Sequence, residues 1–514
     1  MNYIIGIDAG TSNVKAVLFN EKGDEVFIKA LTNEPIRIGD SHVEMDMNIL
    51  WEKTKNCIQE LVTEGPATKE EIIGIGITAQ GEGCWLMDAN GEPVQNAILW
   101  CDARANSVIN QLKKENPTLA QAIYTTTGTE TIAGTQLMLL KWMFDNKKST
   151  LDQACTMFFC KDWLRYKLTG VISADYTDSG TSLLNARTGD IIFDILEELG
   201  LSDYTSYIPA PTSSDTIVAT ISKKMAYELG LKEELPVING AIDVCAAAVG
   251  TGAIHKGDIC VILGTTCANE VIKQKEDCSF GSAGSRFEKY PLGELFLSLQ
   301  PTMNGTPNID WMLENISLTN NFEEIDRILS SEPVGCGGVL YHPYISVAGE
   351  RAPFHHPYAR ANFFGISQLT TRNTLIRAVY EGISLSIRDC LNQELDKNGK
   401  IFLAGGGANS KVWAQMIADV MGMPVYISSG KELGAKGVAI MVGVKQGIYS
   451  DYNDAVARAC HIKQIYYPNE FNSRKYDLIY ELYKEIREVN IPLWNRRHQI
   501  TKTLKTMDET KGEI

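Results

Sequence analysis

Apolar and polar positions follow the same order twice along the chain. Residues 3–26 begin with the continuous apolar run of a buried strand, turn at Gly10-Thr11-Ser12, and continue into a second strand that ends at polar residues 20–24. Residues 258–273 repeat this order, with Gly264-Thr265-Thr266 at the turn. Because the two copies lie about half a chain apart, the pattern predicts two related domains.

Helical and strand-like patterns alternate after each copy. Apolar residues spaced three and four apart predict helices over residues 50–63 and 374–391, and short apolar runs predict strands over residues 72–78 and 401–404. Alternating strands and helices are typical of mixed α/β domains. The sequence therefore predicts an α/β fold in two copies.

The boundary between the copies is expected near residues 250–256, where a glycine-rich stretch follows an apolar helix. We therefore expect residues 1–252 and 253–468 to form two lobes with a cleft between them. Residues 469–514 are rich in Lys, Arg, Glu and Tyr and have helical spacing over residues 476–488. We assign no chemistry to this tail, whose polar end is expected to fray.

The composition is that of a folded globular protein, and it argues against membrane proteins and nucleic-acid-binding proteins. Of 514 residues, 44% are apolar and 22% charged, and no apolar stretch approaches the roughly 18–20 residues of a membrane helix. The first residues lack the basic region of a secretory signal, so we expect a cytoplasmic protein without a membrane partner. A net charge of -15 disfavours nucleic acid as a partner, although a few backbone N–H groups can still hold a small phosphorylated ligand.

The cysteines carry no recognisable metal or disulfide pattern. Twelve cysteines are scattered along the chain without a CxxC pair, which argues against a disulfide framework or a zinc ribbon. The sequence also lacks an HExxH motif. We expect mostly buried, reduced thiols and no structural metal.

The two Gly-Thr turns are candidate phosphate-binding sites. Glycine leaves backbone N–H groups unhindered and the adjacent Thr and Ser add hydroxyl donors, which together match phosphate oxygens. Asp8, on the strand before the first turn, can hold a water bound to Mg²⁺. Each turn alone is equally compatible with an ordinary β-hairpin. Because both turns would face one cleft, the pair favours nucleotide phosphates.

A third glycine-rich segment adds a nucleotide candidate. A predicted strand runs into Gly405-Gly406-Gly407, and a helix with one apolar face follows and ends near Gly422. This order places bare backbone and a helix N-terminus at the carboxyl end of a strand, where nucleotides bind in open α/β sheets. The spacing is neither GxGxxG nor GxxxxGK[ST], which disfavours dinucleotide and P-loop sites. Tight packing of the strand on the helix is the alternative.

A carboxylate stands at a predicted helix start within residues 236–252. A short strand ends at Gly240, Asp243 follows, and a run of small residues continues as a helix. Asp243 is compatible with a helix N-cap or with a general base that accepts the proton of a substrate hydroxyl during phosphoryl transfer. Its position near the expected boundary, between the two turns, favours the base.

Eight segments, in this order and spacing, resemble the FGGY family of carbohydrate kinases, within the actin and hexokinase superfamily, along the chain to about residue 469. They are GIDAGTSNVKAVLFN (residues 6–20), VEMDMNILW (43–51), ILWCDARA (98–105), KDWLRYKLTG (161–170), NGAIDVCAAAVGTG (239–252), ILGTT (262–266), FFGISQLTTRNTLIRAVYEGI (363–383) and AGGGANSKVWAQMIADVMGMPV (404–425). The resemblance implies two duplicated ribonuclease H-like domains, as in actin-like ATPases. It also implies ATP-dependent phosphorylation of a hydroxyl of a small sugar or polyol, with Mg²⁺ as cofactor and a homodimer as assembly.

The resemblance also implies roles for particular residues. Asp243 would be the catalytic base, and Asp8 would hold the metal through water. The nucleotide would contact the first turn (Asp8, Gly10, Thr11, Lys15), the second turn (Gly264, Thr265, Thr266) and the border of the adenosine (Gly305, Gly405, Gly406, Gly407, Asn409). Lys15 is equally compatible with a solvated strand residue, Gly305 with a turn, and Asn409 with a helix cap.

The sugar-contacting segment of this family follows the strand at residues 72–78 and reads Gln80-Gly81-Glu82-Gly83 here. The resemblance implies that Gln80, Glu82 and Trp100 line the substrate pocket with Asp243. The alternatives are surface loop positions for Gln80 and Glu82 and core packing for Trp100. Asp102 and Arg104 are compatible with an ion pair that holds the loop or with substrate contacts.

The substrate remains open among erythritol, xylulose and L-xylulose. The QGEG segment departs from the xylulokinase pattern, and Leu139 replaces the lysine that usually stands three residues before Trp142. Both features look closer to the erythritol and L-xylulose kinase branch. The alternative function is an actin-like or chaperone-like nucleotide switch, which would have the same duplicated turns but no sugar pocket.

Overall fold

The chain folds as two units in the computed structural model, which describes residues 1–39, 41–264, 266–280, 286–303, 305–392, 394–396 and 398–511. Unit 1 comprises residues 1–256, 272–298 and 429–461, and unit 2 comprises residues 257–271, 299–428 and 462–514. Two segments from the second half of the sequence thus fold with unit 1. The domain bounds expected from the sequence stay a prediction.

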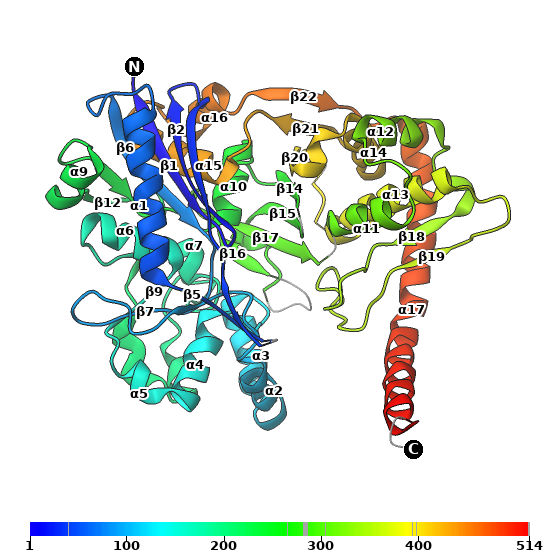
Figure 1. Cartoon of the computed structure of the whole chain (residues 1–514), viewed down its shortest axis with the longest axis horizontal. Helices are drawn as coiled ribbons and strands as arrows, with labels where there is room; N and C mark the ends of the chain where they lie inside the picture. Colours follow the sequence, from blue (N-terminus) through cyan, green and yellow to red (C-terminus); the bar gives the residue numbers. More distant parts are fainter. Residues whose placement is uncertain are drawn as a thin grey trace. The chain divides into compact units, whose positions relative to one another are not determined.

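Unit 1 is built on a six-stranded sheet with the order β12-β13-β6-β1-β2-β3 (Figure 1). β1 pairs antiparallel with β2 across the first Gly-Thr turn and parallel with β6. One face of this sheet packs on α1, which buries Leu50, Ile58 and Leu61 in the same core as Ile5 and Ile7. The elements are β1 Tyr3–Ala9, β2 Asn13–Asn20, β3 Glu25–Thr32, β6 Ile72–Ala79, β12 Ile217–Thr220, β13 Pro236–Ile238 and α1 Met47–Glu64.

Helix α15 (Leu433–Lys445) packs on the opposite face of the sheet, where glycines remove the side chains in its path. A Cβ on Gly6 would lie 2.3 Å from the Ala435 carbonyl oxygen. Helix α10 (Asp243–Thr251) crosses α15 equally closely, because a Cβ on Gly437 would lie 1.8 Å from the Ala246 carbonyl oxygen. These close approaches hold α10, and with it Asp243, in a defined position relative to the sheet.

The remaining elements of unit 1 surround this sheet and form a second apolar core around α4. The strands are β4 Ile36–Ile38, β5 His42–Met45, β7 Trp85–Met87, β8 Ala97–Ile98, β9 Thr156–Phe158, β10 Ala174–Asp175, β11 Pro211–Thr212 and β16 Phe287–Lys289. The helices are α2 Asn106–Glu115, α3 Pro117–Thr127, α4 Gln136–Asn146, α5 Lys148–Leu151, α6 Cys160–Thr169, α7 Tyr176–Ser179, α8 Phe193–Glu198, α9 Lys223–Leu229 and α16 Tyr452–Ala459.

The second large sheet has the order β16-β17-β15-β14-β20-β21-β22. Its strands β14, β20, β21 and β22 belong to unit 2, and β15 and β17 each run from one unit into the other. β14 pairs antiparallel with β15 and parallel with β20. The strands are β14 Ile259–Leu263, β15 Cys267–Gln274, β17 Leu295–Thr302, β20 Ile401–Gly405, β21 Val425–Ser428 and β22 Ile462–Tyr466.

Helices of unit 2 cover the apolar side chains of β14 and β20 in one core. The buried helix α13 runs through this core, and the N-terminal half of α17 packs on it through Tyr476, Tyr480 and Tyr483. The elements are α11 Pro307–Asn315, α12 Phe322–Ser331, β18 Leu340–His342, β19 Asn362–Phe364, α13 Arg372–Leu391, α14 Lys411–Met421 and α17 Glu470–Lys511. Within the described residues, no helix is both long enough and apolar enough to cross a bilayer.

The repeated order of strands is confirmed. In each unit a first strand pairs antiparallel with the next strand and parallel with a later one, as β1 does with β2 and β6 and as β14 does with β15 and β20. The predicted helices and strands at residues 50–63, 72–78, 374–391 and 401–404 correspond to α1, β6, α13 and β20. Helix α17 spans 42 residues, longer than its predicted spacing indicated.

Candidate functional site

Two carboxylates lie at the carboxyl edge of the unit 1 sheet. Asp8 is near the end of β1, and Asp243 is the first residue of α10. The segment before Asp243 is tied to the end of β6, because Ile242 bridges Ala79 and the Thr78 hydroxyl donates to the Ala241 carbonyl at 2.7 Å. The parallel pairing of β1 with β6 therefore brings both carboxylates to one edge.

Asp243 does not hold the N-cap position of α10. Ile242 holds the N-cap position of α10, and the Asp243 carboxylate accepts the N–H of Val244 at 2.8 Å. The N–H of Ile242 donates to the Thr177 hydroxyl at 2.9 Å, and that hydroxyl donates to Asp175 at 2.6 Å. Helix α7 thus positions the start of α10, and Asp243 remains available for chemistry.

Both carboxyl groups have raised pKa values. Burial raises the pKa of Asp243 to about 7, and the charges of Asp8, Glu288 and Glu82 contribute in the same direction. Burial also raises the pKa of Asp8 to about 6, which Lys15 partly opposes and Glu432 reinforces. Carboxyl groups that exchange protons near neutral pH are suited to general base catalysis.

The first Gly-Thr turn contacts two of the predicted substrate residues. The Thr11 hydroxyl donates to Gln80 Oε1 at 2.9 Å and accepts from Trp100 Nε1 at 3.1 Å. Gln80 is buried, which excludes the surface-loop alternative, and Trp100 makes a polar contact rather than packing in the core. The structure thus brings together Thr11, Gln80 and Trp100 from three distant segments.

Asp102 and Arg104 form the ion pair that was one of their alternatives, and Lys15 forms an ion pair that the sequence did not predict. Lys15 Nζ lies 2.6 Å from Glu432 Oε2, so its charge is matched within unit 1. Arg104 Nη2 lies 2.8 Å from Asp102 Oδ2, which also accepts the N–H of Val43 at 2.6 Å. Asp102 and Arg104 therefore hold their loop in place.

Glu82 is buried and paired with a cation that the sequence did not single out. Arg286 Nη2 lies 2.8 Å from Glu82 Oε1, and Arg286 Nε lies 3.1 Å from Glu288 Oε1. Glu82 adopts a left-handed φ of 57°, which is uncommon for residues other than glycine. Arg286 directly precedes β16 and Glu288 lies within it, so these two alternate residues face the same side. The charged residues within RFEKY were the available signal in the sequence.

A buried cluster of charges lies near the segment that carries Glu82. Lys161 is fully buried and lies 2.8 Å from Asp162, 2.7 Å from Asp175 and 3.0 Å from Asp178. Burial, with the charges of Asp175 and Asp162, raises the pKa of Asp178 well above its usual value, although Lys161 opposes the shift. A Cβ on Gly81 would lie 3.1 Å from Asp178 Oδ1, so Asp178 lies beside the segment that carries Glu82.

Unit 2 gathers its predicted glycines at the ends of β14 and β20. A Cβ on Gly305 would lie 2.1 Å from the Gly264 carbonyl oxygen, and one on Gly405 would lie 2.3 Å from the Leu263 carbonyl oxygen. Gly406 is exposed with open space around it. Three distant segments therefore present bare backbone together.

The structure describes only some of the remaining residues of this predicted nucleotide site. Thr265 lies outside the described residues, and Thr266 is exposed. Asn409 Nδ2 donates to the Gly406 carbonyl at 3.1 Å, and the cap of α14 is Ser410. Asn409 therefore stabilises the glycine loop and does not cap the helix.

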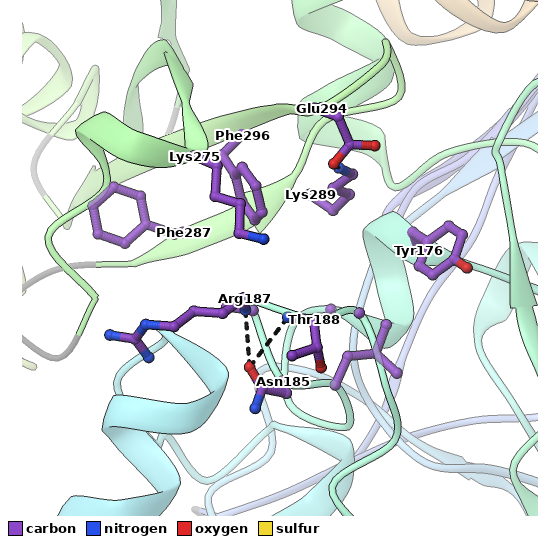
Figure 2. Close-up of a pocket in the computed structure, with 13 residues that line it drawn as sticks. Tyr176, Asn185, Arg187, Thr188, Lys275, Phe287, Lys289, Glu294 and Phe296 are labelled. Carbon is purple, nitrogen blue, oxygen red and sulfur yellow. Dashed lines mark hydrogen bonds and ion pairs between the residues drawn. The ribbon is translucent and has the colours of Figure 1, made fainter.

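A cavity of about 210 Å³ lies on the other side of β16. Phe287 and Lys289 line it, whereas Arg286 and Glu288 alternate with them and pair near Glu82. Figure 2 shows Lys275 and Lys289 on one side of this cavity and Asn185 and Thr188 on the other. None of the described residues that line it is a predicted site residue, so this cavity is separate from the carboxylate edge.

Two protein-family models match the chain. The FGGY family of carbohydrate kinases, N-terminal domain, matches residues 3–250, and the C-terminal domain of the same family matches residues 259–445. Erythritol kinase from Brucella abortus (strain 2308) is 30% identical over 511 residues, which cover 96% of this chain and 97% of the relative. L-xylulose/3-keto-L-gulonate kinase from Escherichia coli (strain K12) is 26% identical, over 94% of this chain and 96% of the relative.

Solved structures have the same fold. Ligand-bound xylulose kinase from Lactobacillus acidophilus superimposes with a TM-score of 0.88 at 22% identity, covering 96% of this chain and 100% of that one. Plasmodium falciparum glycerol kinase with ADP superimposes with a TM-score of 0.84 at 20% identity, covering 95% of this chain and 98% of that one. At these identities the likeness defines the fold, which is the duplicated actin-like architecture expected from the sequence.

Proposed function

Because the chain belongs to the FGGY family of carbohydrate kinases, we propose that it phosphorylates a hydroxyl of a four- or five-carbon polyol or ketulose, with Asp243 as the base. The relatives named erythritol kinase and probable L-xylulose kinase support this substrate class. The nucleotide-switch alternative is not favoured, since the relatives and the structural neighbours are sugar kinases.

One observation carries the proposal: Asp243 stands at the carboxyl edge of the sheet with a pKa raised to about 7. A substrate hydroxyl beside Asp243 gives its proton to the carboxylate as its oxygen forms a bond to the γ-phosphorus of ATP. The bond between that phosphorus and the β,γ-bridging oxygen breaks, and ADP leaves with the electron pair. Thr177 fixes the start of α10, so the carboxylate meets the hydroxyl in one orientation.

The side chains near Asp243 offer donors and acceptors for hydroxyl groups. Glu82 supplies carboxylate oxygens, and Arg286 supplies guanidinium N–H groups at the same place. Gln80 Nε2 is buried beside the Cys160 thiol and has no hydrogen-bonding oxygen among the described residues. A substrate oxygen would satisfy this donor, and a substrate that lacks the matching hydroxyl would leave buried polar groups unpaired.

The residues present fit MgATP. The exposed backbone of Gly405 and Gly406, beside Gly264, suits phosphate oxygens and the border of the adenosine, while Gly305 and Gly407 allow the close packing that holds this loop. Gly10 and Thr11 extend the same chemistry in unit 1. Mg²⁺ would supply charge neutralisation at the phosphates, and Asp8 would hold it through water. The raised pKa of Asp8 favours a cation there, because a cation offsets the cost of its buried charge.

A coupled ADP-release assay tests this function. We expect turnover with erythritol or a related tetritol, or with xylulose or L-xylulose, in preference to glycerol and gluconate. Asp243→Asn should lower kcat by roughly 10²- to 10⁴-fold, because proton transfer to a positioned base contributes about that much. Titration calorimetry should still detect sugar binding in this variant.

Two results would reject the proposal. The first is ADP release that no polyol or ketulose stimulates, and the second is near-normal turnover by Asp243→Asn. The cytoplasmic location and the homodimer expected from the sequence stay predictions.

A further inference from the structure

The cavity beside β16 lies within unit 1. All the residues that line it come from the segments 176–189 and 275–296, which both belong to this unit. Its volume of about 210 Å³ is below the roughly 300–1,000 Å³ of pockets that bind drug-sized molecules. The cavity therefore suits a small metabolite.

The wall formed by β16 and β17 combines aromatic rings with ammonium groups. Phe287 and Lys289 alternate along β16 and line the cavity together. Lys289 stands opposite Phe296 in the strand register, and its Nζ lies 5.0 Å from the centroid of the Phe296 ring. Lys275, which directly follows β15, points into the same space (Figure 2). An occupant would meet both apolar and cationic groups on this wall.

Positive charge collects at the cavity, although the chain as a whole has a net charge of -15. The described residues that line it include three cations and one carboxylate. Arg187 is already engaged, because it donates to the Thr125 carbonyl at 2.8 Å. Within the described residues Lys275 has no ion pair, and Lys289 pairs at 2.9 Å with Glu294, whose side chain is 88% exposed. Because exposed ion pairs contribute little, both ammonium groups are available to an anion.

The opposite wall is a tight turn that presents polar groups. Asn185 Oδ1 accepts the N–H of Arg187 at 2.9 Å and the N–H of Thr188 at 3.4 Å, and the N–H of Gly189 donates to the Asn185 carbonyl at 2.7 Å. These bonds fix the turn opposite the lysines (Figure 2). Tyr176 also lines the cavity, and its hydroxyl has no hydrogen-bonding partner within the described part of the chain. Hydroxyl and amide groups here can bind polar atoms of an occupant.

We propose that this cavity binds a small organic anion, with its phosphate or carboxylate head held by Lys275 and Lys289 and its carbon body against Phe287 and Phe296. Lysine binds such anionic heads as a point charge on a flexible stem. The aromatic rings supply apolar contact area for the body. A bare inorganic ion would leave this aromatic wall uncovered.

Two elements that line the cavity also position the residues of the proposed sugar site. β16 presents Lys289 to the cavity, and Arg286, which directly precedes β16, pairs with Glu82. Helix α7 presents Tyr176 to the cavity, and the next residue, Thr177, holds the start of α10. Binding of the anion should therefore change the affinity for the sugar, a consequence that rests on the proposed function. By linkage, the sugar changes the affinity for the anion by the same factor.

Titration calorimetry of the full chain tests the site. The probes are sn-glycerol 3-phosphate and malate, with glycerol as the neutral control, in the presence of saturating ADP to occupy the nucleotide site. The wild-type protein should bind at least one of the two anions. Lys275→Ala with Lys289→Ala should raise its dissociation constant about 10- to 100-fold, because hydrogen bonds to a charged group are lost. Lys223→Ala with Lys224→Ala removes the same charge from exposed positions of α9 and should leave binding unchanged.

A variant that keeps the charge tests the cavity itself. Thr188→Trp, at an exposed position of the turn, should fill the cavity and also weaken binding of the anion, with a melting temperature near that of the wild type. Three results would overturn the site: neither anion binds at millimolar concentration, the Lys275 and Lys289 double variant binds like the wild type, or the α9 control loses binding as well.

Sugar binding with and without the bound anion tests the coupling. Saturating anion should change the dissociation constant of the sugar by about fivefold or more in the wild type, and should leave it unchanged in the Lys275 and Lys289 double variant. The same value with and without anion in the wild type would overturn the coupling. Without anion, turnover by the double variant should stay near that of the wild type. A failure of the proposed function would instead appear as absent sugar binding beside intact anion binding.

Discussion

The ends of β1 and β14 occupy equivalent places in the two units but carry different chemistry. Both strands precede a Gly-Thr turn, and aligning the turns places Asp8 opposite Ile262. The unit 1 edge adds Asp243, Glu82 and Arg286, whose charges interact. The unit 2 edge instead gathers glycine backbone. In the proposed function the unit 1 edge therefore serves proton transfer and the unit 2 edge contacts phosphates, because the side chains at equivalent strand ends differ.

Among the changes at the unit 1 edge, replacing Arg286 should lower kcat/KM for the sugar the most. Arg286→Met leaves Glu82 and Glu288 buried without their cation, so kcat/KM for the sugar should fall by roughly 10²- to 10³-fold. Arg286→Lys should recover part of the loss, because it restores the charge but not both contacts. Steady-state kinetics measures both variants, and the KM for ATP should stay unchanged. A KM for ATP that rises as much as the sugar KM would show that the two edges are not chemically distinct.

A bulky side chain in the glycine loop should raise the KM for ATP and leave the KM for the sugar unchanged. Gly406 has no neighbour within 4 Å of an added Cβ, so Gly406→Leu should fold normally and occupy space beside the loop. We expect the KM for ATP to rise about 10- to 100-fold while the sugar KM stays constant, as initial rates over both substrates would measure. Gly406→Ala, which adds only a methyl group in the same open space, serves as the matched control and should leave the KM for ATP close to that of the wild type. An unchanged KM for ATP would remove the loop from the nucleotide site.

Asp8→Asn should change the pH dependence of kcat/KM, and this effect should be smaller than the two above. Because the base must be ionised and its pKa is raised to about 7, kcat/KM should fall as pH decreases below about 7. The negative charge of Asp8 raises the pKa of Asp243, so Asp8→Asn should move this acid limb to lower pH, whatever its effect on the maximum rate. The ratio of rates at pH 6 and pH 8 measures the shift.

The exposed Asp24 provides the control for the pH experiment. Asp24→Asn also removes one carboxylate, but this residue is absent from the groups that shift the pKa of Asp243. The acid limb should therefore keep its position in this variant. If the acid limb of the pH profile also keeps its position in Asp8→Asn, the two carboxyl groups are not coupled.

Much of the candidate site could be predicted because its residues follow strand ends. Asp8, Gln80 and Asp243 each come directly after an apolar run, and parallel strands bring their carboxyl ends to one edge. The sequence did not predict the ion pair of Arg286, because its partner Glu82 lies 204 residues away along the chain. The sequence analysis included Lys161, Asp162 and Arg165 only as part of a segment that resembles the family. A local sequence pattern does not reveal that a charged side chain is fully buried.

By itself the sequence determined the duplication, the α/β class, the two Gly-Thr turns and the placing of Asp243 at a helix start, because each depends on the spacing of apolar residues and glycines over a short stretch. The tertiary structure alone decided that residues 272–298 fold with unit 1, that Arg286 neutralises Glu82 and Glu288, and that the pKa of Asp243 rises. These outcomes depend on burial and on charges from distant segments, and electrostatic energies in a protein are set by distance and solvent exclusion rather than by order along the chain.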